Sequence, residues 1–193
     1  MLKIPITAII LAGGKSARMN GNDKGLLLLK DKPLYCHVID KIKPQVNTIM
    51  INSNRNIALY QQTNYKVIND ALPGFLGPLA GIYSGLINSQ TIWNLVVSCD
   101  TPFLPTDLVT RLKQKAINHQ AAYVFDGEKH HPTILLVRRE LAEKIEQYLI
   151  QGDRKLMLFL QTIDAVAVDF SDEKQLFINI NTPQDLNFWN QSL

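Results

Sequence analysis

A short apolar run followed at once by a glycine-rich, positively charged loop constrains this chain more than any other stretch. The run is Ile6–Leu11, which is rich in β-branched residues and short enough to be a buried strand. The adjacent Gly13 and Gly14 let the backbone turn sharply and let a ligand approach without a Cβ in the way. The same loop carries several cations: Lys15, Arg18 and Lys24. Glycines for close approach and cations for charge predict a polyphosphate site.

Two common phosphate-binding loops do not match this stretch. Gly14, Lys15 and Ser16 would end a P-loop, but that motif needs a glycine at position 9, which is Ile9. The dinucleotide motif G-x-G-x-x-G also fails, because the two glycines are adjacent and no third follows at the right spacing. The alternative is a plain glycine-rich turn with a solvated basic face, although the loop is long for a simple connection.

Length and composition indicate an ordinary folded domain. The chain has 193 residues, enough for one sizeable core, so we expect a single domain over residues 1–193. Hydrophobic residues make up 46% and charged residues 19%. The net charge of +3 is too small and unclustered to indicate a nucleic-acid partner, but it suits a pocket for anionic small molecules.

The sequence also bears on location. No run approaches the length of a membrane span, and the first residues lack a signal-peptide cleavage pattern. Cys36 and Cys99 show no C-x-x-C spacing, which predicts two free thiols and neither a zinc site nor a disulfide framework. We therefore expect a cytoplasmic protein with no membrane partner.

The remaining pattern alternates strands and helices. It predicts six helices: about Leu34–Lys43, one that begins near Leu79, Thr106–His119, Arg138–Ile150, Gly152 to about Gln161, and a terminal helix. The expected caps are Thr106 and Asp107 for the third helix and Asn181 or Thr182 for the last. It predicts strands over Asn47–Ile51, Lys66–Ile68, Asn94–Ser98, Ala121–Phe125, Thr133–Val137, Val166–Val168 and Phe177–Ile180. The expected fold is α/β: a three-layer Rossmann-like fold, its sheet mostly parallel with an antiparallel hairpin.

Polar residues follow several of these strands, at the edge where doubly wound sheets bind ligands. Asn52 is a candidate for nucleotide contact, although it could instead cap the next helix. Asp70 could accept hydrogen bonds from the N1–H and the exocyclic amine of guanine, although it could also be a turn residue. Asp100 is well placed to hold Mg²⁺, which needs only one or two carboxylates besides phosphate and water.

A second glycine-rich segment enters a helix near Leu79. Gly77, Gly81 and Gly85 repeat at a spacing of four and share one helical face. That face allows a close approach either of another element or of a ligand, and the sequence leaves both open. The start of the helix also offers free N–H groups to an anion.

The first loop resembles the signature loop of the nucleotidyltransferase superfamily with a Rossmann-like fold, in the form L-A-G-G-x-S-x-R-M-x-G-x-D-K-G-L. With Asp23-Lys24-Gly25-Leu26 it is similar to the molybdenum cofactor guanylyltransferases. The resemblance covers nearly the whole chain, through motifs that occur in order at Leu11, Asn52, Asp70, Gly77, Asp100 and Asn179. This ordered set is much more specific than any single motif.

The resemblance implies transfer of GMP from GTP, with Mg²⁺, to the phosphate of molybdopterin or the molybdenum cofactor, and molybdoenzymes that accept the cofactor as partners. It assigns catalytic roles to Arg18, Lys24 and Asp100, with Asp100 as the metal ligand. It assigns the nucleotide to Leu11, Ala12, Gly13, Gly14, Lys24, Asn52, Asp70, Gly77 and Asp100. It assigns the acceptor to Gly21, Gly81, His131, Arg154, Lys155, Asn179 and Asn181.

Some of these assignments have alternatives. Relatives often show two arginines where this chain has Arg154 and Lys155, so bidentate phosphate contact by Lys155 is in doubt. Asn179 and Asn181 could instead serve the cap of the last helix. A molybdopterin cytidylyltransferase, a sugar-phosphate nucleotidyltransferase or a non-catalytic GTP-binding delivery protein would share the loop. Asp70 favours guanine, and Asp100 favours an enzyme.

Overall fold

The computed structural model describes residues 4–12, 14, 22–74 and 76–192. Within them, seven strands form one sheet in the order β5-β4-β1-β6-β8-β7-β9. Their bounds are β1 Ile6–Leu11, β4 Thr48–Asn52, β5 Lys66–Ile68, β6 Trp93–Ser98, β7 Ala121–Phe125, β8 His130–Arg138 and β9 Ala165–Asp169. β1 pairs in parallel with β4 and β6, β4 with β5, and β7 with β9. β8 runs antiparallel to β6 and β7, so the predicted sheet, mostly parallel with one hairpin, is confirmed.

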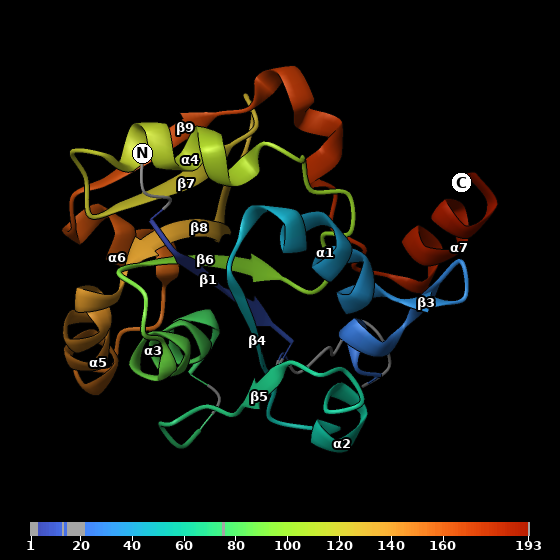
Figure 1. Ribbon diagram of the computed structural model, residues 1–193, viewed down its shortest axis with the longest axis horizontal. Coiled ribbons are helices and arrows are strands. Elements are labelled where there is room, and N and C mark those ends of the chain that lie inside the picture. The colour runs from blue at the N-terminus through green and yellow to red at the C-terminus, as the bar shows by residue number, and fades with distance from the viewer. Residues whose placement is uncertain (1–3, 13, 15–21, 75, 193) are drawn as a thin grey trace.

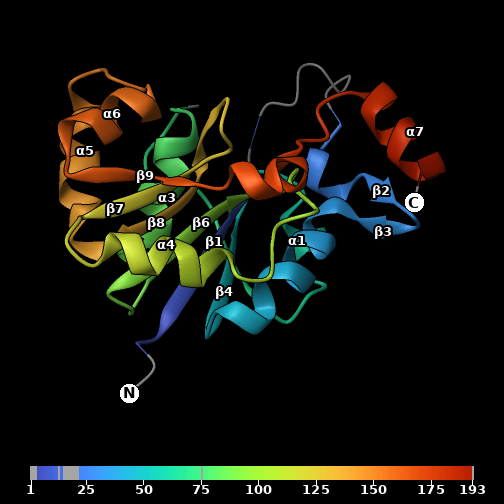
Figure 2. The same ribbon diagram turned by 90° about the horizontal axis from the view of Figure 1, so that it is seen from above.

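Helices cover both faces of the sheet, because the central strands are apolar on both sides. Their bounds are α1 Leu34–Ile42, α2 Ile57–Tyr60, α3 Pro78–Asn88, α4 Leu108–Ala116, α5 Ala142–Ile150, α6 Leu156–Thr162 and α7 Pro183–Ser192. α1 and α4 pack on one face, and α3, α5 and α6 pack on the other, as Figures 1 and 2 show. Among the helices described, none is long and apolar enough to cross a membrane.

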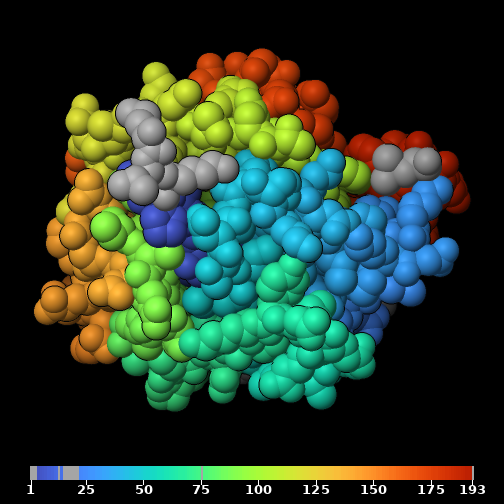
Figure 3. All heavy atoms as spheres, in the orientation of Figure 1, coloured from blue at the N-terminus to red at the C-terminus, as the bar shows by residue number. Residues whose placement is uncertain are grey.

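A small hairpin and the last helix form an outlying part of the molecule. The strands β2 Leu28–Leu29 and β3 Lys32–Pro33 pair antiparallel beside α7. Leu29 and Ile180 are buried together there, and Asn190 of α7 bonds to the backbone of the hairpin. Figure 3 shows the blue hairpin against the red C-terminal helix. The hairpin near residue 30 and the C-terminal helix are therefore joined at this side of the protein.

α3 lies close to the sheet because two of its residues lack a Cβ. A Cβ on Gly85 would come within 2.4 Å of Ile9 Cδ1, and one on Gly81 within 2.4 Å of Asn52 Oδ1. These two glycines therefore permit close helix–sheet packing, the first of the two explanations for the repeat. Gly77 precedes the helix with φ +77°, a conformation that side chains rarely adopt.

The predicted strand over Phe177–Ile180 is wrong. Residues Ser171–Phe177 form a 3₁₀-helix, and the residues after it are extended without joining the sheet. The apolar residues of this segment have another cause, since Phe177 and Ile180 are buried in two different apolar clusters. The residues between them are then free to face the other side.

Several predicted helix starts also need correction. The Asp107 side chain does not cap α4; Gln45 Oε1 accepts the hydrogen bond from Val109 N instead, at 3.0 Å. Arg138 ends β8, and a 3₁₀-helix, Arg139–Leu141, leads into α5. α6 begins at Leu156, because the residues after Gly152 serve as a connection. Local sequence could not show that a distant glutamine fills the place of a cap.

We expect Gly85→Ala to destabilise the protein by about 1–3 kcal/mol, because the added methyl group would press on the fully buried Ile9. Alanine at an ordinary helical position would stabilise it instead. Urea unfolding measures the change, with Ile87→Ala, a substitution at an exposed position of the same helix, as the control. An unchanged or raised stability in Gly85→Ala would contradict this account of the packing.

Candidate functional site

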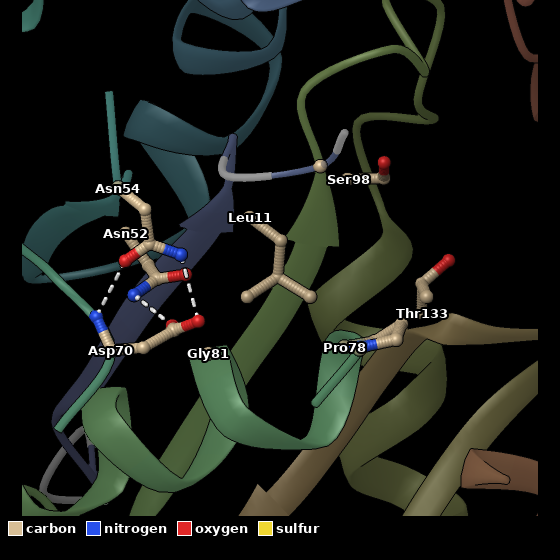
Figure 4. A pocket seen from close by; sticks show the side chains of 10 residues that line it. Leu11, Asn52, Asn54, Asp70, Pro78, Gly81, Ser98 and Thr133 are labelled. Carbon is tan, nitrogen blue, oxygen red and sulfur yellow. Dashed lines mark hydrogen bonds between the residues drawn. The ribbon is translucent and has the colours of Figure 1, made fainter. Parts of the chain in front are cut away.

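A cavity of about 360 Å³ opens at the carboxyl ends of β1, β4 and β6. The chain changes direction across the sheet between β1 and β6, which is where doubly wound folds bind ligands. Figure 4 shows the labelled residues around it. The lining residues are Leu11, Gly14, Asn52, Asn54, Asp70, Gly77, Pro78, Gly81, Ser98 and Thr133. The structure therefore brings together the predicted Leu11, Gly14, Asn52, Asp70, Gly77 and Gly81.

A carboxylate held by two amides forms one side of this cavity. Asp70 follows β5, and its Oδ1 accepts a hydrogen bond from Asn52 Nδ2 at 3.0 Å. Its Oδ2 accepts one from Asn54 Nδ2 at 2.7 Å. Asn52 is buried between Asp70 and α3, so its amide belongs to the wall of the cavity. Beside it, the buried Ala12 ties β1 to β4 through Ala12 N and Asn52 O, 2.8 Å apart.

A second carboxylate, Asp100, lies buried just beyond the end of β6. Its Oδ1 accepts hydrogen bonds from Ser98 Oγ at 2.5 Å and from Asn179 Nδ2 at 3.3 Å. Its Oδ2 forms an ion pair with Lys24 Nζ at 3.1 Å, and the same ammonium group donates to Asn181 Oδ1 at 2.7 Å. Since Ser98 also lines the cavity, this charged cluster adjoins it.

The chain segment after Phe177 delivers the two asparagines. Ile180 N donates to Asp100 O at 2.9 Å, which fixes the backbone between them. Asp185 Oδ2 then accepts from Asn181 N and Thr182 N, and Thr182 Oγ1 accepts from Asp185 N, as in a capping box. Burial raises the pKa of the Asp185 carboxyl, but these hydrogen bonds outweigh burial and lower it overall. Thr182 is thus the cap that the sequence suggested, and Asn181 faces Lys24.

Asp23 holds the segment that carries Lys24. This buried carboxylate accepts hydrogen bonds from Gly25 N at 3.2 Å, Tyr60 Oη at 2.7 Å and Asn56 Nδ2 at 3.1 Å. Burial, together with nearby Cys99 and Asp23, raises the pKa of Tyr60 far above its usual value, so the hydroxyl remains a donor. The backbone is therefore held in place both before Lys24, through Asp23, and after it, through Gly25.

The residues around Asp100 fit a magnesium ion bound together with phosphates. No group of three or more histidine, cysteine or acidic side chains converges within the described ranges. Mg²⁺ does not need such a group, because it keeps water and phosphate ligands beside one or two carboxylates. Asp100 is a buried carboxylate whose present cationic partner, Lys24, sits on a flexible side chain.

Burial also defines the state of the neighbouring cysteine. It raises the pKa of the Cys99 thiol well above its usual value, with Asp100 and Asp23 adding to the effect. Cys99 is therefore a protonated, buried side chain and not a nucleophile.

The remaining described residues predicted for the acceptor do not line the cavity, although a Cβ on Gly77 would come 3.9 Å from the Arg154 carbonyl oxygen. His131 Nε2 pairs with Asp126 Oδ2 at 2.7 Å and packs near Phe177, two residues before Asn179. Adjacent His130 stacks on Tyr123 and Phe125 instead, so the two histidines do not share a ligand. Arg154 bonds to the carbonyl oxygens of Leu149 and Asp153, and Lys155 is exposed. Gly13, Arg18 and Gly21 lie outside the described residues.

Sequence reasoning missed several polar residues of the site. Asn54 had a usable signal, because it stands two residues after Asn52 and so shares its side of an extended chain. Ser98 is the polar last residue of an apolar strand and could have been found in the same way. No local pattern distinguishes Tyr60, whose role depends on a partner 37 positions away.

A crevice at the switch point of a mostly parallel sheet, with Asp70 on its wall and the Lys24–Asp100 pair adjoining it, is typical of α/β proteins that bind nucleotides. Comparisons with known proteins narrow the class. Residues 8–166 match the model of a family described as the MobA-like NTP transferase domain. A protein of Yersinia pseudotuberculosis named molybdenum cofactor guanylyltransferase is 50% identical over 186 residues, which are 96% of this chain and 95% of the relative. The chain therefore belongs to the MobA-like NTP transferase family.

Solved structures agree on the fold. The molybdopterin-guanine dinucleotide biosynthesis protein A of Archaeoglobus fulgidus superposes with a TM-score of 0.81 at 23% identity, covering 96% of this chain and 97% of that one. The 4-diphosphocytidyl-2C-methyl-D-erythritol synthase of Anaerococcus prevotii gives 0.77 at 13% identity, covering 97% and 95%. At these identities the likeness concerns architecture alone.

We expect Tyr60→Phe to destabilise the protein by about 1.5–3 kcal/mol, because the buried Asp23 loses a donor to a charged group. Loosening of the Lys24 segment should also weaken nucleoside triphosphate binding several-fold. Thermal unfolding and calorimetric titration measure both effects. Tyr83→Phe is the matched control, since it removes a 2.6 Å bond to Glu146 on α5 and should leave nucleotide affinity unchanged. Equal affinities in the two variants would contradict the role given to Asp23.

The Asp126 carboxyl should make stability depend on pH in acid. Burial raises its pKa, but hydrogen bonds from His131 and from Lys129 N and Glu128 N outweigh burial and lower it to about 2. Because the folded pKa is below the unfolded one, this contribution is complete above about pH 4 and is lost as the pH falls through about 2. Relative to Asp126→Asn, the wild type should be about 2 kcal/mol more stable at pH 7, a difference that shrinks in acid.

Denaturant titrations from pH 7 downward test this dependence. Asp153→Asn, which changes an exposed carboxylate, is the control and should follow the wild type throughout. A gap between wild type and Asp126→Asn that stays constant from pH 7 to the acid limit of folding would contradict the assignment.

Proposed function

We propose that this protein transfers GMP from GTP to the terminal phosphate of molybdopterin or its molybdenum form, releasing pyrophosphate. The observation that carries the proposal is a single crevice with Asp70 at one side and the Lys24–Asp100 pair adjoining it. Such a crevice suits a ligand with a base at one end and phosphates at the other. The name of the 50% identical relative supports both guanine and this acceptor.

Asp70 is the group that we assign to the base. The two amides leave each of its oxygens with capacity to accept a further hydrogen bond. Guanine presents N1–H and an exocyclic amine side by side, and both can donate to one carboxylate. Cytosine presents an amine beside an acceptor and fits this arrangement less well. Asp70 therefore favours GTP over CTP.

The reaction that we propose is a direct displacement at phosphorus. An oxygen of the acceptor phosphate forms a bond to the α-phosphorus of GTP, and the bond from that phosphorus to the oxygen bridging to the β-phosphate breaks. Pyrophosphate leaves with the electron pair, and no covalent enzyme intermediate is needed, in keeping with the protonated Cys99. Lys24, with Arg18, neutralises charge on the triphosphate, so catalysis consists of positioning and electrostatic stabilisation.

We assign Mg²⁺ to Asp100, with Asn179 and Asn181 close to it. When bound, the metal ion would neutralise phosphate charge and help to orient the triphosphate. Lys24 would then exchange its bond to Asp100 for one to a phosphate, because its side chain is long and flexible.

The acceptor is assigned to the side of the crevice near the C-terminal segment. Asn179 and Asn181 are its best supported residues, since they lie beside Asp100 and Lys24. Gly21, Gly81, His131, Arg154 and Lys155 remain predictions. We further propose that the protein works in the cytoplasm, where its free thiols Cys36 and Cys99 stay reduced, and that molybdoenzymes receive its product.

The test begins with thermal unfolding in the presence of GTP, CTP, ATP or UTP, each with and without Mg²⁺. We expect GTP to stabilise the protein most and Mg²⁺ to increase the effect. Asp100→Asn should abolish the Mg²⁺ increment and lower turnover with molybdopterin by a factor on the order of 100 or more. Asp31→Asn is the control, because this exposed residue has φ 60°, which asparagine tolerates.

Two outcomes would overturn the proposal. A larger shift with CTP would keep the fold and the chemistry but change the product. Normal turnover by Asp100→Asn would exclude the role given to the metal site.

A further inference from the structure

Asn54 makes a paired contact with the carboxylate assigned to the base. Its Nδ2 donates to Asp70 Oδ2 at 2.7 Å, and its Oδ1 accepts from Asp70 N at 2.8 Å. The Asn54 amide is therefore hydrogen-bonded to both the backbone and the side chain of Asp70. Figure 4 shows the two bonds, together with the bond from Asn52 on the other oxygen.

These hydrogen bonds determine the direction in which the carboxylate faces. Asp70 is only half-buried, so packing alone does not hold its rotamer. Asn52 Nδ2 reaches only Oδ1, and a carboxylate bonded through one oxygen can still turn about its Cβ–Cγ bond. The bond from Asn54 to Oδ2 removes that freedom. Both oxygens then keep a fixed orientation while each retains capacity for one more donor.

We propose that Asn54 is a positioning residue that sets the selectivity of the site for guanine, by holding Oδ2 of Asp70 where it meets the second donor of the base. The inference rests on the proposed function, because it requires Asp70 to read guanine. Asn54 acts through Asp70 and shares in selection of the nucleotide without taking part in phosphoryl transfer.

The chemistry at this position requires an amide. Asparagine supplies a donor to the carboxylate and an acceptor for the backbone N–H at the same time. Aspartate at position 54 would keep the acceptor but place a second negative charge against Asp70 Oδ2, where like charges repel. Alanine would remove both bonds and leave water to replace them.

A simpler role for Asn54 would be to tie two surface loops together. That role would affect stability and would weaken every nucleotide alike. A role in base selection would instead change the ratio of two affinities. ITP is the suitable probe, because its base differs from guanine only in lacking the exocyclic amine, the second donor to Asp70.

The experiment measures the Kd of GTP and of ITP by calorimetric titration of the full chain with Mg²⁺. In the wild type, ITP should bind about 10- to 100-fold more weakly, the usual worth of a hydrogen bond to a charged group. In Asn54→Ala we expect this ratio to fall by about 5- to 10-fold, mainly through weaker GTP binding. Asn54→Asp should lose about 100-fold in GTP affinity. Asn64→Ala, at an exposed turn, is the control and should keep the wild-type ratio.

Asp70→Ala tests the recognition of guanine by Asp70 separately from the positioning role of Asn54. With Asp70 absent, the ratio should approach 1, and adding Asn54→Ala should change it no further. If the ratio of the ITP and GTP dissociation constants is unchanged in Asp70→Ala, Asp70 does not recognise guanine, and the inference about Asn54 is overturned as well. A ratio that falls in Asp70→Ala but not in Asn54→Ala would leave the proposed function intact and overturn only the inference.

Discussion

The parallel hydrogen-bond ladder between β1 and its neighbours β4 and β6 is the interaction on which the rest of this structure depends. Its register sets Leu11 beside Asn52 on one side and beside Ser98 on the other. Parallel strands end at the same edge, so three chain segments far apart in sequence deliver their polar residues to one place. The crevice follows from this register, and a slip of one residue would turn each side chain to the opposite face.

Carboxylates organise the crevice, and each one accepts hydrogen bonds from neutral donors, with a cation also close to Asp100 and to Asp23. Asp23 is held by a tyrosine, an asparagine and a backbone N–H, Asp70 by two asparagines, and Asp100 by a serine and an asparagine together with Lys24. Groups that are buried or half-buried need such partners, because an unpaired charge there is costly. The asparagines thus make it possible to keep negative charge at the edge of an apolar sheet.

Much of this arrangement was predictable from sequence. Apolar runs with polar residues after them place Leu11, Asn52, Asp70 and Asp100 at strand ends, and the structure has them there. Long-range partners were not predictable, since nothing near Asp107 indicates that Gln45 bonds to the start of α4. The segment Phe177–Ile180 was mistaken for a strand because three of its four residues are apolar, and apolar residues report burial whether or not the chain joins a sheet. Asn54 had a signal in its spacing from Asn52, but its role depends on the partner Asp70, 16 positions away, which the local sequence does not show.

The contact of Lys24 with Asn181 also separates the completeness of the site from that of the sheet. These residues are 157 positions apart, and the matched family domain ends at residue 166, before the asparagines appear. All seven strands of the main sheet lie at or before β9, which ends at Asp169, yet Lys24 takes one of its partners from beyond it. An intact sheet therefore does not ensure an intact site, because a segment that follows the sheet closes the charged cluster around Asp100.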